Sequence, residues 1–166
     1  TEGSVENVAL LESQAVDLAL IQGGTAVNSE HLRGLASLYF EPLWIFVRSS
    51  AVDEPITRLR ELSSLRVSAG ASGSGTRALA QELFSLNGMK LEGFLDLNTA
   101  EASKALIAGE LDAAFVVGGA TSPDVATLLR AEGIELVDLQ RAEAYHIQHR
   151  YLSPLSLPAG AIDLAE

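Results

Sequence analysis

A Gly/Ser-rich loop between a short apolar strand and an amphipathic helix, at residues 66–84, constrains the fold more than any other feature. The first amide groups of a helix have no intrahelical acceptor, and the helix dipole places partial positive charge on them. Glycine lets a ligand approach the backbone closely, and Ser72, Ser74 and Thr76 supply hydroxyl groups beside these amides. The segment therefore predicts an α/β unit with a site for a carboxylate, phosphate or sulfate.

The composition excludes several classes of protein. At 166 residues, 48% of them hydrophobic, the chain has the length and apolar content of one medium domain or two small lobes. A formal net charge of -11 argues against nucleic acid or an anionic membrane as a partner, because both require a basic surface. Cysteine is absent, so disulfides, thiol nucleophiles and thiolate metal sites are excluded.

Two segments, 6–24 and 101–119, share a weak internal similarity. Each predicts a helix, a tight turn at an acidic residue (Asp17 or Asp112), a buried strand and a Gly-Gly exit. The exits are Gly23-Gly24 and Gly118-Gly119. Because open α/β sheets bind ligands beyond the carboxyl ends of their strands, two such units facing one cleft are the simplest interpretation.

Other elements follow from apolar runs and helix signals. Strands are predicted at 43–47, 94–97 and 134–139, the first of them covered on both faces. Asn98 with Glu101, and Ser122 with Pro123, predict helix starts, and Asn87-Gly88 predicts a helix end. The tail at 145–162 is predicted to be mostly irregular.

Five segments in this order resemble the TAXI-type (NMT1-like) solute receptors of tripartite TRAP transporters. They are Gly3-Ser4-Val5-Glu6-Asn7, Val16-Asp17-Leu18-Ala19-Leu20-Ile21-Gln22, Leu38-Tyr39-Phe40-Glu41-Pro42-Leu43, Gly73-Ser74-Gly75-Thr76-Arg77 and Leu157-Pro158-Ala159-Gly160. The resemblance implies an α/β protein of the type II periplasmic-binding-protein class, with two lobes that close on a small organic acid or amino acid.

The chain departs from this family at its start. Family members begin with a strand and a Gly/Thr-rich loop, and this sequence starts after both. Residues 1–45 and 140–166 are therefore expected to form a partial, N-terminally truncated first lobe, and residues 46–139 the second lobe. We expect the missing wall to impair ligand affinity.

The resemblance also implies partners and a compartment. The partners would be a small anionic solute and the membrane subunits of a TRAP transporter, with no nucleic acid. The protein would be periplasmic or extracytoplasmic. Some relatives carry membrane helices beyond a segment like Ala161-Ile162-Asp163-Leu164, so a membrane anchor outside the given chain is a further expectation.

The candidate ligand-binding residues come from the Gly/Ser loop and from positions that the resemblance places at the cleft. They are Ser4, Asn7, Gln22, Tyr39, Ser72, Ser74, Gly75, Thr76, Arg77, Gly118 and Gly119. Each has a simpler structural alternative: the serines and Asn7 as helix caps, Arg77 as a solvated side chain, Tyr39 as a half-buried residue and the glycines as turns. We interpret Trp44 as a core residue, and His146 and His149 as surface residues, so no metal site is predicted.

No enzyme and no cofactor are predicted. The loop is not a G-x-S-x-G elbow, because Gly and Ser alternate out of register around Ser72 and Ser74. It is not a P-loop, because Thr76 stands where lysine is required. An alternative is a dinucleotide-binding, Rossmann-like domain of an oxidoreductase, since residues 73–78 fit G-x-G-x-x-A and Asp96 follows at about the expected distance of roughly 20 residues. A third class is the effector-binding module of a transcriptional regulator, but no helix-turn-helix is present.

Overall fold

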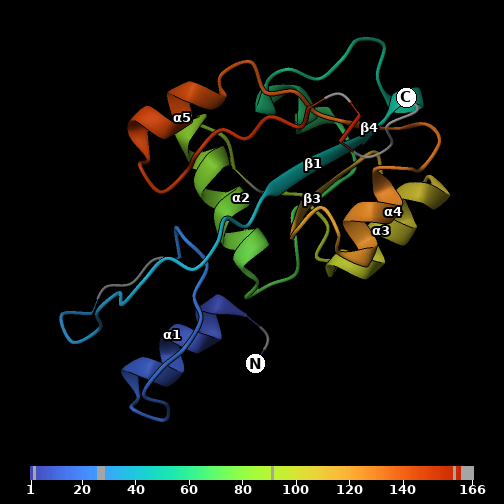
Figure 1. The fold of residues 1–166 in the computed structure, drawn as a ribbon. Coiled ribbons are helices and arrows are strands. Elements are labelled where there is room, and N and C mark those ends of the chain that lie inside the picture. Colours follow the sequence, from blue (N-terminus) through green and yellow to red (C-terminus); the bar gives the residue numbers. More distant parts are fainter. Residues whose placement is uncertain (2, 26–28, 91, 159, 162–166) are drawn as a thin grey trace.

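In the computed structural model, helices cover both faces of a mixed four-stranded sheet (Figure 1). The structure describes residues 1, 3–25, 29–90, 92–158 and 160–161. The helices are α1 (Ser4–Glu12), α2 (Gly75–Leu86), α3 (Thr99–Ala108), α4 (Pro123–Leu128) and α5 (Ala142–Gln148), with 3-10 turns η1 (Ser49–Ala51) and η2 (Leu59–Ser64). The strands are β1 (Leu43–Arg48), β2 (Val67–Ser68), β3 (Ala113–Val117) and β4 (Ile134–Leu136). None of the described helices has the length and apolar character needed to cross a bilayer.

The central strand pair of the sheet is β1 and β3. The strand order is β2-β3-β1-β4, with β2 parallel to β3 and β1 antiparallel to both β3 and β4. The pairing register sets Ile45 opposite Phe115 and Phe46 opposite Ala114. Because successive side chains point to opposite faces, the continuous apolar run of β1 supplies two different cores. The prediction of a strand at 43–47 covered on both faces is confirmed.

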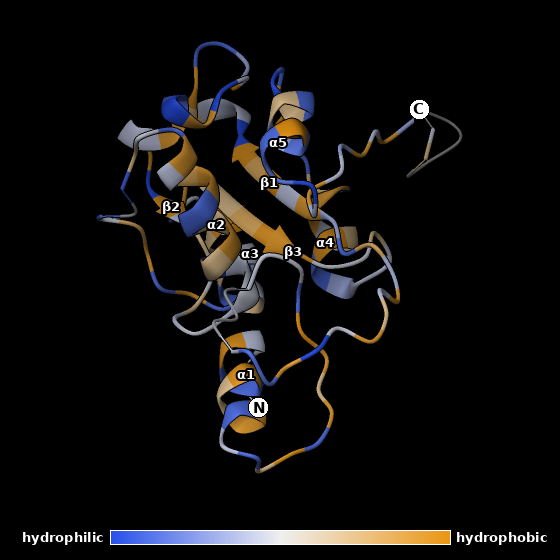
Figure 2. Cartoon of the chain, turned by 90° about the vertical axis from the view of Figure 1, so that its left-hand side faces the viewer, coloured by the Kyte–Doolittle hydropathy of each residue, from blue (hydrophilic) through white to orange (hydrophobic). Residues whose placement is uncertain are grey.

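One core lies on each face of the sheet, so the apolar colour of the central strands continues into the helices on either side (Figure 2). Ile45 and Phe115 pack toward α2, where Phe84 is fully buried. Phe46 and Val116 pack toward α3 and α4. The resulting architecture has three layers, helix, sheet and helix.

Most of the helix boundaries predicted from the sequence are found in the structure. The Ser74 hydroxyl accepts a hydrogen bond from the Arg77 amide at 3.1 Å and caps α2. Asn98 and Glu101 form a reciprocal capping box at α3, and Pro123 occupies the first turn of α4. The predicted helix end at Asn87 is also confirmed, because Asn87 is the C-cap of α2.

Some elements differ from the sequence predictions. The predicted strand at 94–97 is reduced to an isolated bridge between Leu95 and Ser68, and the tail contains helix α5. α5 contacts the α2 side of the sheet through Tyr145, so part of the tail belongs to this core. The division into lobes at 45/46 and 139/140 remains a prediction.

The predicted buried strand of the first internal copy is wrong. Helix α1 forms, but Leu18 and Leu20 are 71% and 65% exposed in an irregular extended segment. Among the described residues, no strand pairs with this segment, so its apolar side chains have no sheet to cover. The second copy is complete, with α3 followed by the buried strand β3. The matching sequences therefore fold differently because only the second has neighbours in the sheet.

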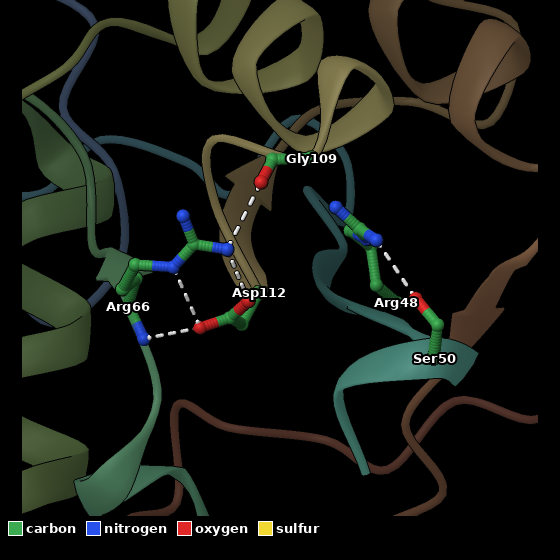
Figure 3. Close-up of polar contacts among 5 residues, drawn as sticks. All are labelled: Arg48, Ser50, Arg66, Gly109 and Asp112. Atoms are coloured by element: carbon green, nitrogen blue, oxygen red, sulfur yellow. Dashed lines mark hydrogen bonds and ion pairs between the residues drawn. The ribbon is translucent and has the colours of Figure 1, made fainter.

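Asp112 joins the starting ends of the parallel strands β2 and β3 (Figure 3). Its carboxylate accepts from the Arg66 amide at 2.9 Å and from the guanidinium Nε and Nη2 at 3.0 and 2.6 Å. Arg66 Nη2 also donates to the Gly109 carbonyl at 2.9 Å. The side-chain hydrogen bond from Arg66 is the main reason that the pKa of Asp112 lies below its ordinary value.

Asp112→Asn tests this contact. We expect the free energy of unfolding near neutral pH to fall by about 1 kcal/mol, since the Arg66 side chain is half exposed and screened. That loss corresponds to about 2–4 °C in Tm. Because the folded pKa of Asp112 is lowered, its contribution is present above the unfolded value of about 3.9 and disappears as pH falls through the folded pKa.

Thermal unfolding of both proteins at several pH values measures this difference. The control is Glu92→Gln, which removes an exposed ion pair with Lys90 and should leave Tm unchanged. A gap between Asp112→Asn and the parent chain that persists unchanged at about pH 2 would contradict the assignment.

Candidate ligand-binding site

The N-terminal ends of α1 and α2 lie against each other. The N-cap of α1 is Gly3, and a Cβ placed on it would lie 3.2 Å from the Gly73 carbonyl oxygen and 3.4 Å from Ser74 Cα. Only a residue without a side chain permits this approach, and the φ of Gly3 is +148°. Two helix ends, each carrying partial positive charge, therefore meet at the Gly/Ser loop.

Three predicted residues of the N-terminal segment come together at this junction. Ser4 Oγ accepts from the Gln22 amide at 2.9 Å, and Asn7 Nδ2 donates to the Leu20 carbonyl at 2.9 Å. These bonds fold the segment after α1 back along the helix. The Gln22 side chain lies directly over Gly75, where a Cβ would overlap its Oε1 atom. Gln22 thus links the first segment to the start of α2.

The loop amides are only partly used within the protein. The Ser72 amide donates to Asp96 Oδ1 at 2.7 Å, and the Ser74 amide donates to the Ala71 carbonyl at 3.0 Å. In the part of the chain that the structure describes, no acceptor is bonded to the amides of Gly75 and Thr76. These two amides remain available to an external acceptor.

Asp96 belongs to the loop, although the sequence analysis did not count it as a site residue. Hydrogen bonds from the Ser72 side chain and then the Ser72 amide lower the pKa of its carboxyl group, with the charge of Arg77 adding to the effect. A negative carboxylate therefore already occupies one edge of the loop. Its place beside the loop follows from the bridge between Leu95 and Ser68, which the sequence alone does not show.

Arg77 and Thr76 serve the loop itself in this structure. Arg77 Nη1 lies 3.4 Å from the carbonyl oxygens of both Gly70 and Leu95, and the Thr76 side chain is buried beside Gly70. These contacts hold the chain reversal at Gly70, whose φ is +90°. A carboxylate clamp at Arg77 remains a prediction, and Nε and Nη2 are the donors that these two contacts leave unused.

Gly118 and Gly119 lie at the same end of the sheet as the loop, because they follow β3 and β3 is parallel to β2. The Gly118 carbonyl accepts from Trp44 Nε1 at 2.7 Å, and its amide donates to the Pro42 carbonyl. Trp44 is buried, as expected of a core residue. A Cβ on Gly119 would meet no atom within 4 Å, so Gly119 faces open space.

An open groove of about 2050 Å³ runs beside this junction. Its walls are residues 17–23, 31–45 and 150–157, with parts of α2 and α5. Ser4, Gln22 and the exposed Tyr39 line it, whereas residues 72–77 do not. The predicted residues therefore fall into a group at the groove and a group at the loop, which Gln22 connects, whereas Asn7, Gly118 and Gly119 belong to neither group.

Tyr151, which the sequence analysis missed, closes one side of the groove against Gly23 and Gly24. Burial is the main cause of the raised pKa of its hydroxyl, followed by the negative charge of Glu82. Glu82 Oε1 lies 3.5 Å from His149 Nδ1, and the His149 ring meets Tyr151 edge-on. His149 is thus a packing residue of this wall. Within the described residues, no cluster of His, Asp or Glu has the arrangement of a metal site.

The family profile described as NMT1-like matches residues 1–165. The chain belongs to the NMT1-like family. A match over nearly the whole chain agrees with the family-level resemblance seen in the sequence. The finer assignment to the TAXI receptors of TRAP transporters remains a prediction.

Solved structures with the same fold include two with TM-scores of at least one half. The effector binding domain of QuiR in complex with shikimate has a TM-score of 0.56 and 14% identity, and the match covers 83% of this chain and 62% of that one. The arginine-, lysine-, histidine-binding protein ArtJ from Geobacillus stearothermophilus has a TM-score of 0.50 and 18% identity, over 79% of this chain and 54% of that one. The predicted α/β fold of type II periplasmic binding proteins is confirmed.

The periplasmic aliphatic sulphonate binding protein SsuA from Escherichia coli matches at a TM-score of 0.46 and 22% identity, over 59% of this chain. The chain spans 33%, 54% and 62% of the lengths of SsuA, ArtJ and the QuiR domain. Of the sequence segments behind the family resemblance, Ala159 lies outside the described residues, as do residues 162–164 of the segment that suggested an anchor.

The dinucleotide-binding alternative is not supported. β1 is antiparallel to its neighbours, so the sheet is not a doubly wound parallel one. Asp96, which this alternative assigned to a ribose, is instead bonded to the Ser72 amide of the loop.

Gly24→Ala tests the contact with Tyr151. The φ of Gly24 is +87°, and a Cβ there would lie 2.7 Å from Tyr151 Cζ, so we expect the variant to lose about 1–3 kcal/mol of stability. Thermal unfolding measures the loss. The matched control is Gly93→Ala, whose φ is +86° and where a Cβ meets nothing within 4 Å, so it adds a similar backbone strain without a contact and should lower Tm less. Equal effects of the two substitutions would contradict this packing.

Proposed function

We propose that the chain is a non-catalytic, extracytoplasmic solute receptor that binds a small anionic ligand, an organic acid or amino acid. Membership of the NMT1-like family and the fold of type II periplasmic binding proteins support a solute-binding role. The ligand carboxylate would sit where α1 and α2 meet and extend into the groove lined by Gln22 and Tyr39.

The observation that carries the proposal is the pair of helix N-termini with amides still available. The Gly75 and Thr76 amides supply two donors at the positive end of α2, and the positive end of α1 adds to the local potential. A net charge of -11 does not prevent anion binding there, because oriented amides act at short range and distant charges are screened.

The mechanism would be a shift toward a closed state. A ligand that touches both the α1 segment and the α2 loop binds better when the two are together, and so it increases the population of that arrangement. The membrane subunits of a TRAP-type transporter would then recognise the closed form. The receptor would work in the periplasm, either free or held by an anchor outside the given chain.

The proposal predicts that Ser74→Ala combined with Thr76→Ala weakens carboxylate binding by about tenfold or more, because the end of α2 loses its cap and its order. Isothermal titration calorimetry measures the affinity. The matched control is Asn98→Ala, which removes the equivalent cap of α3 and costs a similar stability of about 1 kcal/mol. Affinity that is unchanged in the double variant, or equally reduced in the control, would refute the site.

A thermal-shift screen of the chain against monocarboxylates, dicarboxylates and amino acids would identify the ligand class. A ligand present at about 100 times its Kd adds about 2.7 kcal/mol to the free energy of unfolding. We expect one carboxylate class to raise Tm, and the rise to disappear in the Ser74→Ala, Thr76→Ala variant. The absence of any shift at millimolar concentrations, or a shift with cationic amines alone, would contradict an anionic ligand.

A further inference from the structure

We propose that the chain holds a second anion site, distinct from the amides of Gly75 and Thr76, that binds a small phosphate-type oxyanion at the C-terminal end of α2. A cavity of about 260 Å³ lies there between the turn η2, the end of α2 and the start of α5. Three arginines, Arg58, Arg60 and Arg141, line it together with Asn87 and Tyr145. We call it the arginine cavity.

The charge of the arginine cavity is opposite to that of the protein. The chain has 11 basic residues against 22 acidic ones, yet three of those 11 line this one small cavity. Within the described residues, no carboxylate forms an ion pair with the three arginines. Such a concentration of unpaired positive charge in an acidic protein favours an anion that neutralises it.

Glu61 is the carboxylate whose charge acts on Arg58, and it is already used within the backbone. Its Oε2 atom accepts from the amides of Thr57 at 2.8 Å and Arg58 at 3.1 Å. The Thr57 bond is the main reason that the pKa of Glu61 is lowered, so the group is ionised near neutral pH. Glu61 is therefore engaged by backbone amides rather than by a salt bridge to the arginines.

Hydrogen bonds between the three elements fix part of the cavity in advance. Arg60 Nη2 donates to the Asn87 carbonyl at 3.0 Å, which ties the turn η2 to the end of α2. Asn87 Nδ2 donates to the Leu83 carbonyl at 2.7 Å and to the Tyr145 hydroxyl at 2.8 Å, which ties α2 to α5. In Figure 1, α5 lies beside α2, as these bonds require. A site that is already formed avoids part of the entropic cost of binding.

The Tyr145 hydroxyl adds a directed donor. Its oxygen accepts from Asn87, and among the described residues nothing accepts its proton. The guanidinium groups of Arg58 and Arg141 likewise have no acceptor in the described part of the chain. The cavity therefore presents several donors that have no acceptor within the described chain, and such donors complement an oxyanion.

The size of the cavity and the shape of the arginine side chain favour a small oxyanion as the ligand. The volume is just below the roughly 300–1,000 Å³ of typical small-molecule pockets, so it suits a small ion or group. The planar fork of arginine binds phosphate through two parallel hydrogen bonds, and several arginines around one group neutralise its double charge. Because the arginines are exposed, salt should weaken the binding.

The arginine cavity and the amides of Gly75 and Thr76 lie at opposite ends of the same helix, although the cavity shares Leu139 and Tyr145 with the wall of the groove. α2 has 12 residues, so its length of about 18 Å separates the amides of Gly75 and Thr76 from Asn87. Variants at one end can therefore be matched with variants at the other. This separation lets a test of the arginine cavity fail or succeed independently of the proposed solute receptor function.

The test is calorimetric titration of the chain with inorganic phosphate at low salt. Arg58→Gln combined with Arg141→Gln should weaken phosphate binding by about tenfold or more, because each lost charge-assisted bond is worth roughly a factor of ten. Arg60 is kept because it also holds Asn87. Circular dichroism and Tm establish that the variant folds.

The control is Lys104→Gln combined with Arg130→Gln, which removes the same charge from exposed side chains that line neither the arginine cavity nor the groove. It should leave phosphate affinity within about twofold, as expected for distant screened charges. The proposal is overturned if both double variants lose affinity equally, if only Ser74→Ala with Thr76→Ala reduces it, or if the parent chain binds no phosphate at millimolar concentration.

Discussion

Burial of both faces of the β1–β3 pair is the constraint on which the rest of the structure depends. β1 contributes Ile45 and Val47 to one core and Trp44 and Phe46 to the other, and all four are nearly excluded from solvent. α2 covers one face of this pair, and α3 and α4 cover the other. Because β2 and β3 are parallel, the Gly/Ser loop that follows β2 and the Gly118-Gly119 exit that follows β3 lie at the same end of the sheet.

Two polar centres lie at opposite ends of β2 and β3, and they have different roles. Arg66 and Asp112 lie where β2 and β3 begin, pair with each other completely and stabilise the fold. At the other end of these strands, the loop amides are satisfied only in part. Unsatisfied donors at the surface are available to a ligand, whereas a closed ion pair is not. This difference, more than the identity of the residues, distinguishes the candidate site from the structural contact.

Local signals in the sequence were sufficient for much of the fold. The continuous apolar run at β1, the caps at Ser74 and Asn98 and the proline in the first turn of α4 depend on neighbouring residues only, and all are found in the structure, although Ser122 makes no side-chain cap bond. The segment at Leu18 and Leu20 was wrongly predicted to be a buried strand. The similar segment in the second copy forms β3 because it has neighbouring strands in the sheet. Asp96 and Tyr151 were missed because their roles arise from contacts with Ser72 and Gly24, which are distant in the sequence.

α1 shares no buried cluster with the sheet, since neither core includes any of its residues. It meets the body through Gly3, which lies against Gly73 and Ser74, and through Gln22, which is bonded to Ser4 and lies over Gly75. Amide hydrogens of α1 should therefore exchange with solvent through a local opening that is much less costly than global unfolding. Capture of a solute and integrity of the core would then be governed by separate free energies, and evolution or design could tune the first without endangering the second.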